Sequence, residues 1–407
     1  MREKGRIKEV NPGIVKLLRR IFNFYFKYKF NIKTILPPEV AEIEGSFIIL
    51  PNHQGFWDPF FIGISLPQVP YFVTSDAVYR SKIFGFFMRK FGTIPKTKSQ
   101  SDIDAIKNIM EMKKMGRCVG IFSEGQRTWD GCTLPVIKST AKLVRLMKLP
   151  VVTVVFKGGY LSQPRWRKSI SQGELEIEYK LLYKGDEVSK KRISEIYQDL
   201  TEALSHDEIE YQKERKIEWK NNKAAENIEQ FLFVCPECGS FEGFSSSGVK
   251  FKCQNCNSEW SFDKYQQIIP ESSQKTFSNV RDWDHWQLEQ MKEQIDNLFH
   301  DGKQIFSDSD VVFQTGFKSK RLKFLAKGTI KMEDKSLIFE GKNGKILKKM
   351  DLSKIVGINV QNHEVLDFYY DNVLYTVNNP KKHFSAYKWW RAIDYIQKDI
   401  LKLNLPE

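Results

Sequence analysis

The first half of the chain alternates short apolar runs with longer amphipathic stretches. The apolar runs have the length and the β-branched content of buried strands, whereas the amphipathic stretches repeat their apolar residues with the helical period. The predicted strands lie at 46–50, 150–156 and 175–183, and the predicted helices at 138–148 and 190–204. Strands that alternate with helices build layered domains. The pattern therefore predicts an α/β domain over residues 36–210, with a mostly buried sheet flanked by helices.

A basic amphipathic segment, residues 1–35, precedes this domain. Residues 12–30 carry apolar side chains at helical spacing and basic side chains on another face. Residues 1–33 hold ten Lys or Arg against Glu3 and Glu9, a net charge of +8 out of +14 for the whole chain. A basic helix rich in Phe can lie in the interface of an anionic bilayer, and it can also pack on the protein's own core. Both alternatives stay open at this point.

The longest uncharged run does not have the form of a membrane-spanning helix. It covers residues 59–75, only 17 positions, and it contains Gly63, Pro67 and Pro70. The N-terminus also lacks the apolar core of a secretory signal. We therefore expect a cytoplasmic protein, peripheral on the cytoplasmic face of a membrane.

The second half of the chain has a different pattern. Residues 211–230 are charged and helix-prone, which suggests a helical linker, and 275–300 form an amphipathic helical pattern. From 305 to 403, short alternating segments are separated by turn residues and followed by a helix that Ser385 can cap. A strand-rich domain closed by one C-terminal helix resembles the pleckstrin-homology-like superfold.

Four of the six cysteines form two Cys-x2-Cys pairs, Cys235 with Cys238 and Cys253 with Cys256. Each pair can present two thiolates to one tetrahedral ion, which is typical of a zinc ribbon. Because cysteine fills all four positions, the sequence predicts a closed, structural Zn²⁺ site over residues 231–265. Basic and aromatic residues nearby would also suit a nucleic-acid surface. However, aromatic residues that fill a very small core are the favoured interpretation, so nucleic acid is not favoured as a partner.

Two short motifs in the first half carry candidate chemistry. His53 and Asp58 are five positions apart, and a histidine oriented by a carboxylate is a general base. Further along, Arg127 follows Glu124 and Gly125, and its guanidinium can bind an anionic group with two hydrogen bonds. Acyl transfer from a thioester to a phosphorylated alcohol needs such a base and such a cation. Each motif is common by itself.

The two motifs in this order resemble the glycerophospholipid acyltransferases, especially the 1-acylglycerol-3-phosphate (lysophosphatidate) acyltransferases. Residues 92–98 are similar to the family's second block, with Lys98 about where an Arg often stands, and residues 149–154 to its apolar fourth block. The resemblance implies that His53 is the base and that Asp58 orients it. It also implies that the acceptor is bound by Glu124, Gly125, Arg127 and Lys98.

The resemblance predicts a membrane-associated O-acyltransferase of phospholipid synthesis. It would move a fatty acyl group from acyl-CoA or acyl carrier protein to the free hydroxyl of lysophosphatidate, at an anionic membrane surface. Ser123 replaces the family's usual Pro, and Lys98 replaces Arg, which leaves another lysophospholipid acceptor open. A non-enzymatic binding or scaffold protein that carries a zinc ribbon is the alternative from a different class.

Overall fold

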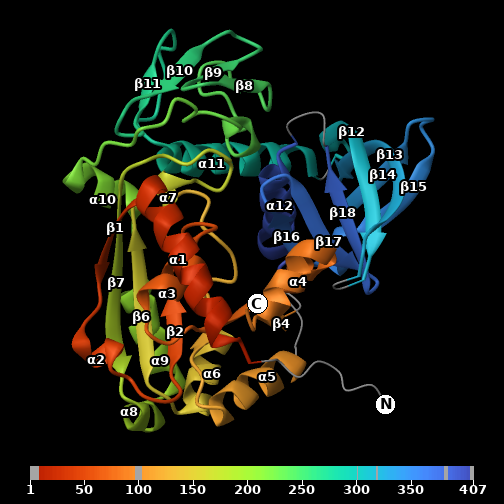
Figure 1. Ribbon diagram of the computed structural model, residues 1–407. Coiled ribbons are helices and arrows are strands. Elements are labelled where there is room, and N and C mark those ends of the chain that lie inside the picture. Colours follow the sequence, from red (N-terminus) through yellow and green to blue (C-terminus); the bar gives the residue numbers. More distant parts are fainter. Residues whose placement is uncertain (1–8, 97–102, 300, 318–319, 380–383, 404–407) are drawn as a thin grey trace. The chain divides into compact units, whose positions relative to one another are not determined.

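The computed structural model describes residues 9–96, 103–299, 301–317, 320–379 and 384–403 (Figure 1). The chain forms two compact units. Unit 1 consists mainly of Met1–Arg165 and Ile170–Asn221, and unit 2 of Trp166–Ser169 and Asn222–Pro406. In the described residues, no helix combines the length and the apolar character needed to cross a bilayer.

Unit 1 contains a seven-stranded sheet between two layers of helices. In sheet order, its strands are β1 (Asn31–Ile35), β7 (Glu174–Tyr183), β6 (Val151–Lys157), β2 (Ile48–Pro51), β5 (Val119–Gly120), β3 (Tyr71–Ser75) and β4 (Ile94–Lys96). Neighbouring strands are parallel except β6 and β7, which are antiparallel. The α/β class predicted from the apolar pattern is therefore confirmed for this unit.

Alternating residues of β2 show why both faces of the sheet are covered. Ile48 and Leu50 point to one core, which α5 (Ile103–Lys114), α6 (Lys138–Met147) and α9 (Ile193–Leu204) complete. Ile49 points to the other core, which Phe26 of α1 (Pro12–Lys29) and Phe61 of α3 (Asp58–Ser65) complete. Helix α1 crosses this second face in Figure 1. The shorter helical elements of unit 1 are α2 (Pro38–Ala41), η1 (Asp76–Arg80), α4 (Lys82–Lys90), α7 (Gly159–Ser162), α8 (Gly185–Lys190) and α10 (Glu208–Arg215).

Two helical predictions need correction. The helix expected over 190–204 begins at Ile193 instead, because Lys191 and Arg192 are extended and the Glu195 carboxylate accepts a hydrogen bond from the Arg192 amide at the start of α9. The helical linker expected over 211–230 is not continuous, since α10 ends at Arg215 and only η2 (Ile228–Gln230) follows. Between them the chain buries Trp219 against the backbone of Gly173, and an irregular path makes this packing possible.

Unit 2 contains two antiparallel sheets. The smaller sheet has the order β11 (Ile268–Pro270), β10 (Glu259–Phe262), β9 (Lys250–Cys253) and β8 (Phe244–Ser247), and α11 (Val280–Phe299) follows it. The larger sheet has the order β15 (Ile346–Asp351), β14 (Ser336–Gly341), β13 (Lys323–Glu333), β12 (Gln304–Gly316), β18 (Val373–Asn378), β17 (Val365–Tyr370) and β16 (Val356–Gln361). The turns η3 (Leu352–Lys354) and η4 (Ile396–Ile400) complete the unit with α12 (Ala386–Tyr395), which packs on β16 and β17. The expected strand-rich domain with a closing helix is present, and its pleckstrin-homology-like assignment stays a prediction.

Candidate active site

Two loops at one edge of the sheet in unit 1 carry the candidate residues. His53 follows β2, and Glu124, Gly125 and Arg127 follow β5. Strands β2 and β5 are adjacent and parallel, so their carboxyl ends lie at the same edge. Ligands of open α/β sheets bind in crevices at this kind of edge. The topology therefore brings together two motifs that lie about 70 residues apart in the sequence.

Asp58 contacts the His53 ring and accepts three hydrogen bonds through one oxygen. Its Oδ2 accepts from His53 Nδ1 at 2.9 Å, from the Gln54 amide at 2.8 Å and from the Gly55 amide at 2.9 Å. Asp58 is 1% exposed, whereas the His53 side chain is 19% exposed. A carboxylate in this position only accepts, so Nδ1 carries the imidazole proton and Nε2 keeps its lone pair. Asp58 is also the first residue of α3, with Trp57 as the N-cap residue.

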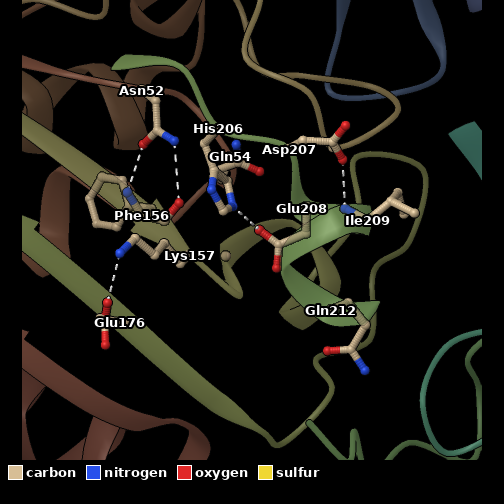
Figure 2. Close-up of polar contacts among 12 residues, drawn as sticks. Asn52, Gln54, Phe156, Lys157, Glu176, His206, Asp207, Glu208, Ile209 and Gln212 are labelled. Carbon is tan, nitrogen blue, oxygen red and sulfur yellow. Dashed lines mark hydrogen bonds and ion pairs between the residues drawn. The ribbon is translucent and has the colours of Figure 1, made fainter. Parts of the chain in front are cut away.

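Asn52 fixes the start of the His53 loop (Figure 2). Its side chain donates to the Phe156 carbonyl at 3.2 Å and accepts from the Phe156 amide at 2.8 Å. These two bonds continue the pairing of β2 with β6 by one residue and leave Asn52 fully buried. The sequence reasoning gave Asn52 no role. The signal that could have found it is an amide side chain directly after an apolar strand, because it can replace a backbone pair.

Glu124 connects the two loops instead of facing solvent. One of its oxygens accepts from the His53 amide at 2.6 Å and the other from the Leu134 amide at 2.7 Å. Burial raises the pKa of Glu124 to about 8, while the two amide donors act in the opposite direction. Gly125 follows in a left-handed conformation, φ +72°, where a Cβ would come within 2.8 Å of Ile137. The geometry thus gives Glu124 and Gly125 a part in shaping the turn that carries Arg127.

Arg127 lies beside His53. The amide of the next residue, Thr128, donates to the His53 carbonyl at 3.0 Å. Burial lowers the pKa of Arg127, and the Asp58 carboxylate opposes this effect. Burial likewise lowers the pKa of His53, against Asp58, and the positive charges of Arg127 and Arg165 lower it further. The imidazole is therefore held neutral at pH 7, the form that a general base requires.

The sequence reasoning also missed Arg165. This side chain is almost completely buried, and its charge acts on His53 together with that of Arg127. No sequence motif marks Arg165, because it lies nearly 40 positions after Arg127 in an irregular segment. Another unanticipated neighbour is Phe122, whose ring stacks on His53 with centroids 3.9 Å apart. The predicted acceptor-binding residue Lys98 lies outside the described residues.

The four predicted metal ligands of unit 2 form one cluster. The Sγ atoms of Cys235, Cys238, Cys253 and Cys256 all lie within 4.8 Å of one another. Cys235 and Cys256 are 3.7 Å apart, and Cys238 and Cys253 are 3.8 Å apart. Zn–S bonds of about 2.3 Å in a tetrahedron give S···S separations of about 3.8 Å. The geometry therefore fits a zinc ion.

Comparisons with known proteins agree with the site in unit 1. Residues 28–157 match the family model described as "Acyltransferase". The match includes His53, Asp58, Glu124, Gly125 and Arg127.

Curated relatives of the matched region are named 1-acyl-sn-glycerol-3-phosphate acyltransferases. A chloroplastic protein of Brassica napus is 29% identical over 32% of this chain and 38% of its own length. The Bacillus subtilis protein is 25% identical over 28% of this chain and 57% of its own length, and the Saccharomyces cerevisiae protein 30% identical over 27% and 38%. The matches thus span from 38% to 57% of the length of these relatives. A crystal structure of the 1-acyl-sn-glycerophosphate acyltransferase of Thermotoga maritima aligns with 47% of this chain and 79% of that chain, at 19% identity and a TM-score of 0.39.

Proposed function

We propose that the chain is an O-acyltransferase that moves a fatty acyl group from an acyl thioester to the free hydroxyl of lysophosphatidate. The observation that carries this proposal is the His53–Asp58 pair, 2.9 Å apart, with Arg127 on the loop that binds the His53 carbonyl. The family of residues 28–157 and the names of the relatives support the reaction and the acceptor. The donor is acyl-CoA or acyl carrier protein.

His53 acts as the base in this reaction. Nε2 accepts the hydroxyl proton while the hydroxyl oxygen attacks the thioester carbonyl and forms a tetrahedral intermediate. The carbon–sulfur bond then breaks, and the imidazolium returns its proton to the leaving sulfur, so that an ester and a free thiol are released. Asp58 stabilises the imidazolium between these steps, and it never needs to become protonated. Arg127 binds the acceptor's phosphate and positions its hydroxyl.

Thiol release from an acyl thioester, measured with vesicles present, tests this function. We expect His53→Ala to lower kcat by about 10²- to 10⁴-fold, the usual contribution of a general base. His206→Gln is a matched control, because His206 also pairs with a carboxylate, Glu208, at 2.9 Å, but on another loop (Figure 2). This control should keep most of the wild-type activity. Normal turnover by a folded His53→Ala variant would exclude His53 from the mechanism.

The choice of acceptor tests the role of Arg127. Wild type should prefer lysophosphatidate over a monoacylglycerol, which offers a hydroxyl but no phosphate. Arg127→Gln should reduce this preference, since a neutral amide cannot form the two charge-assisted hydrogen bonds that a guanidinium makes to phosphate. Equal rates on both acceptors would contradict the phosphate site. If no lysolipid is acylated at all, the acyltransferase proposal fails, and a non-enzymatic binding or scaffold protein is the alternative.

We also propose that α1 binds an anionic membrane surface. Phe22 and Phe26 of this helix pack on the core of unit 1, so packing on the protein's own core accounts for one side of the helix only. A second apolar stripe at spacings of three and four is 38–81% exposed, and it consists of Ile14, Leu17, Ile21, Phe24 and Tyr28. Basic residues of the same helix can meet anionic head groups.

Co-sedimentation with vesicles that contain phosphatidylglycerol tests the membrane surface. Phe24→Asp should reduce binding, because it places a charge in the centre of the stripe. Phe324→Asp is the control, since Phe324 is a comparably exposed phenylalanine of unit 2. Unchanged binding of Phe24→Asp would refute the proposal.

The cysteine cluster is proposed to hold one structural Zn²⁺. When bound, the ion would join the two Cys-x2-Cys turns and stabilise the small sheet β8–β11. We expect one zinc per purified chain, and loss of this zinc in Cys253→Ser. Cys132→Ser is the control, because Cys132 lies outside the cluster. A reduced wild-type protein that contains no zinc would contradict the assignment.

A further inference from the structure

Arg165 contacts three residues of the loop that carries Arg127. Its Nη1 donates to the Arg127 carbonyl at 2.9 Å and to Gln126 Oε1 at 3.3 Å. Its guanidinium lies 4.4 Å from the centre of the Trp129 ring, within the range of a cation–π interaction. Arg165 is 4% exposed, so these contacts are made away from solvent. One buried side chain therefore holds residues 126, 127 and 129 at once.

Arg165 contacts Arg127 through the backbone carbonyl of that residue. A guanidinium is planar and rigid, so it fixes a carbonyl and a ring in one relative geometry. A lysine at this position would keep the charge and lose the planar arrangement. Position 165 therefore requires a planar side chain as well as a positive charge.

We propose that Arg165 is a positioning residue that holds the 126–129 loop so that Arg127 faces the acceptor's phosphate beside His53. This inference rests on the proposed function, because it assigns the accuracy of phosphate binding to a residue that acts through Arg127. It differs from a purely structural role in one respect. Loss of Arg165 should impair acceptors that carry a phosphate more than acceptors that do not.

Steady-state kinetics with lysophosphatidate and with monoacylglycerol give the first test. Arg165→Lys should raise the KM for lysophosphatidate, by up to about 100-fold if the loop shifts by about 1 Å, and change the monoacylglycerol rate little. Arg117→Gln is the control. Arg117 is a partly buried arginine of the same unit, but it precedes β5 and so lies at the opposite end of that strand from the site. Equal losses on both acceptors, or an unchanged KM, would overturn the proposal.

An NMR titration of the His53 ring gives a second test that needs no turnover. Arg165→Gln removes a positive charge that acts on His53 and should shift its titration to higher pH, whereas Arg165→Lys should leave it near the wild-type value. Glycerol 3-phosphate, followed by the same resonance, should bind more weakly to both variants than to wild type. If wild type acylates nothing but these binding changes appear, the proposed function fails and the role of Arg165 stands. If wild type acylates lysophosphatidate and both variants bind glycerol 3-phosphate normally, the role of Arg165 fails alone.

Discussion

Replacing Asp58 by Asn separates the charge of this residue from its geometry. Asp58 Oδ2 accepts from His53 Nδ1 and from the amides of Gln54 and Gly55. An asparagine can place only its oxygen in that position, because an NH₂ group there would face two amide donors. The oxygen still accepts from His53 Nδ1. The variant should therefore keep the imidazole tautomer and lose only the negative charge.

The size of the effect follows from this loss. A hydrogen bond to a charged group contributes about 1.5–3 kcal/mol, and the imidazolium that forms during the reaction loses this interaction in the variant. At about 1.4 kcal/mol per factor of ten, kcat should fall roughly 10- to 150-fold. The acidic limb of the pH profile should move to lower pH, since the Asp58 charge raises the pKa of His53.

Thiol release at saturating donor and acceptor measures kcat, and thermal unfolding checks that the variant is folded. Asp58→Ala is a useful contrast. It leaves the amides of Gln54 and Gly55 buried without their acceptor, at about 1–3 kcal/mol each, so it should unfold at a clearly lower temperature than Asp58→Asn. A kcat for Asp58→Asn within twofold of wild type would refute a role for the charge. A loss as large as that of His53→Ala would show that the tautomer is not preserved.

Three further predictions concern His53, Glu124 and Asn52. Because the pKa of His53 is lowered from its ordinary value of 6.5, the acidic limb of the kcat/KM profile should have its midpoint below pH 6.5. The unfolded chain binds this proton more tightly, so the contribution of His53 to stability is present above pH 6.5 and is lost as the pH falls through the folded pKa. A midpoint above pH 6.5 would contradict this. Glu124→Gln offers one acceptor to two amides, so denaturant unfolding should show a loss of about 1–3 kcal/mol, and an unchanged free energy of unfolding would refute the bridge. Asn52→Ala should lower the free energy of unfolding by a similar amount, about 1–3 kcal/mol, because the buried Phe156 amide and carbonyl lose their hydrogen-bond partner. Full stability would show that water replaces the side chain.

The sequence was sufficient for the strands of the unit 1 sheet that it predicted and for the motif residues. The buried strands β2 and β6 are marked by apolar runs, and His53 and Arg127 by their place after apolar strands. The start of α9 at Ile193 was not predictable from periodicity, because a local bond between the Glu195 carboxylate and the Arg192 amide decides it. Trp219 likewise gave the linker a buried path that charge and helix propensity do not reveal. Tertiary contacts decide such positions, and local propensity is only a weak guide to them.

The candidate site was predictable in its residue types and not in how these residues are joined. Glu124 was expected to bind the acceptor, and in the structure its oxygens accept from the amides of His53 and Leu134. His53 is consequently held at its amide by Glu124, at its carbonyl by the Thr128 amide and at its ring by Asp58. Two of these three attachments come from the loop that carries Arg127. Hydrogen bonds across neighbouring parallel strands thus join two motifs that lie far apart in the sequence, as the proposed reaction on one small substrate requires.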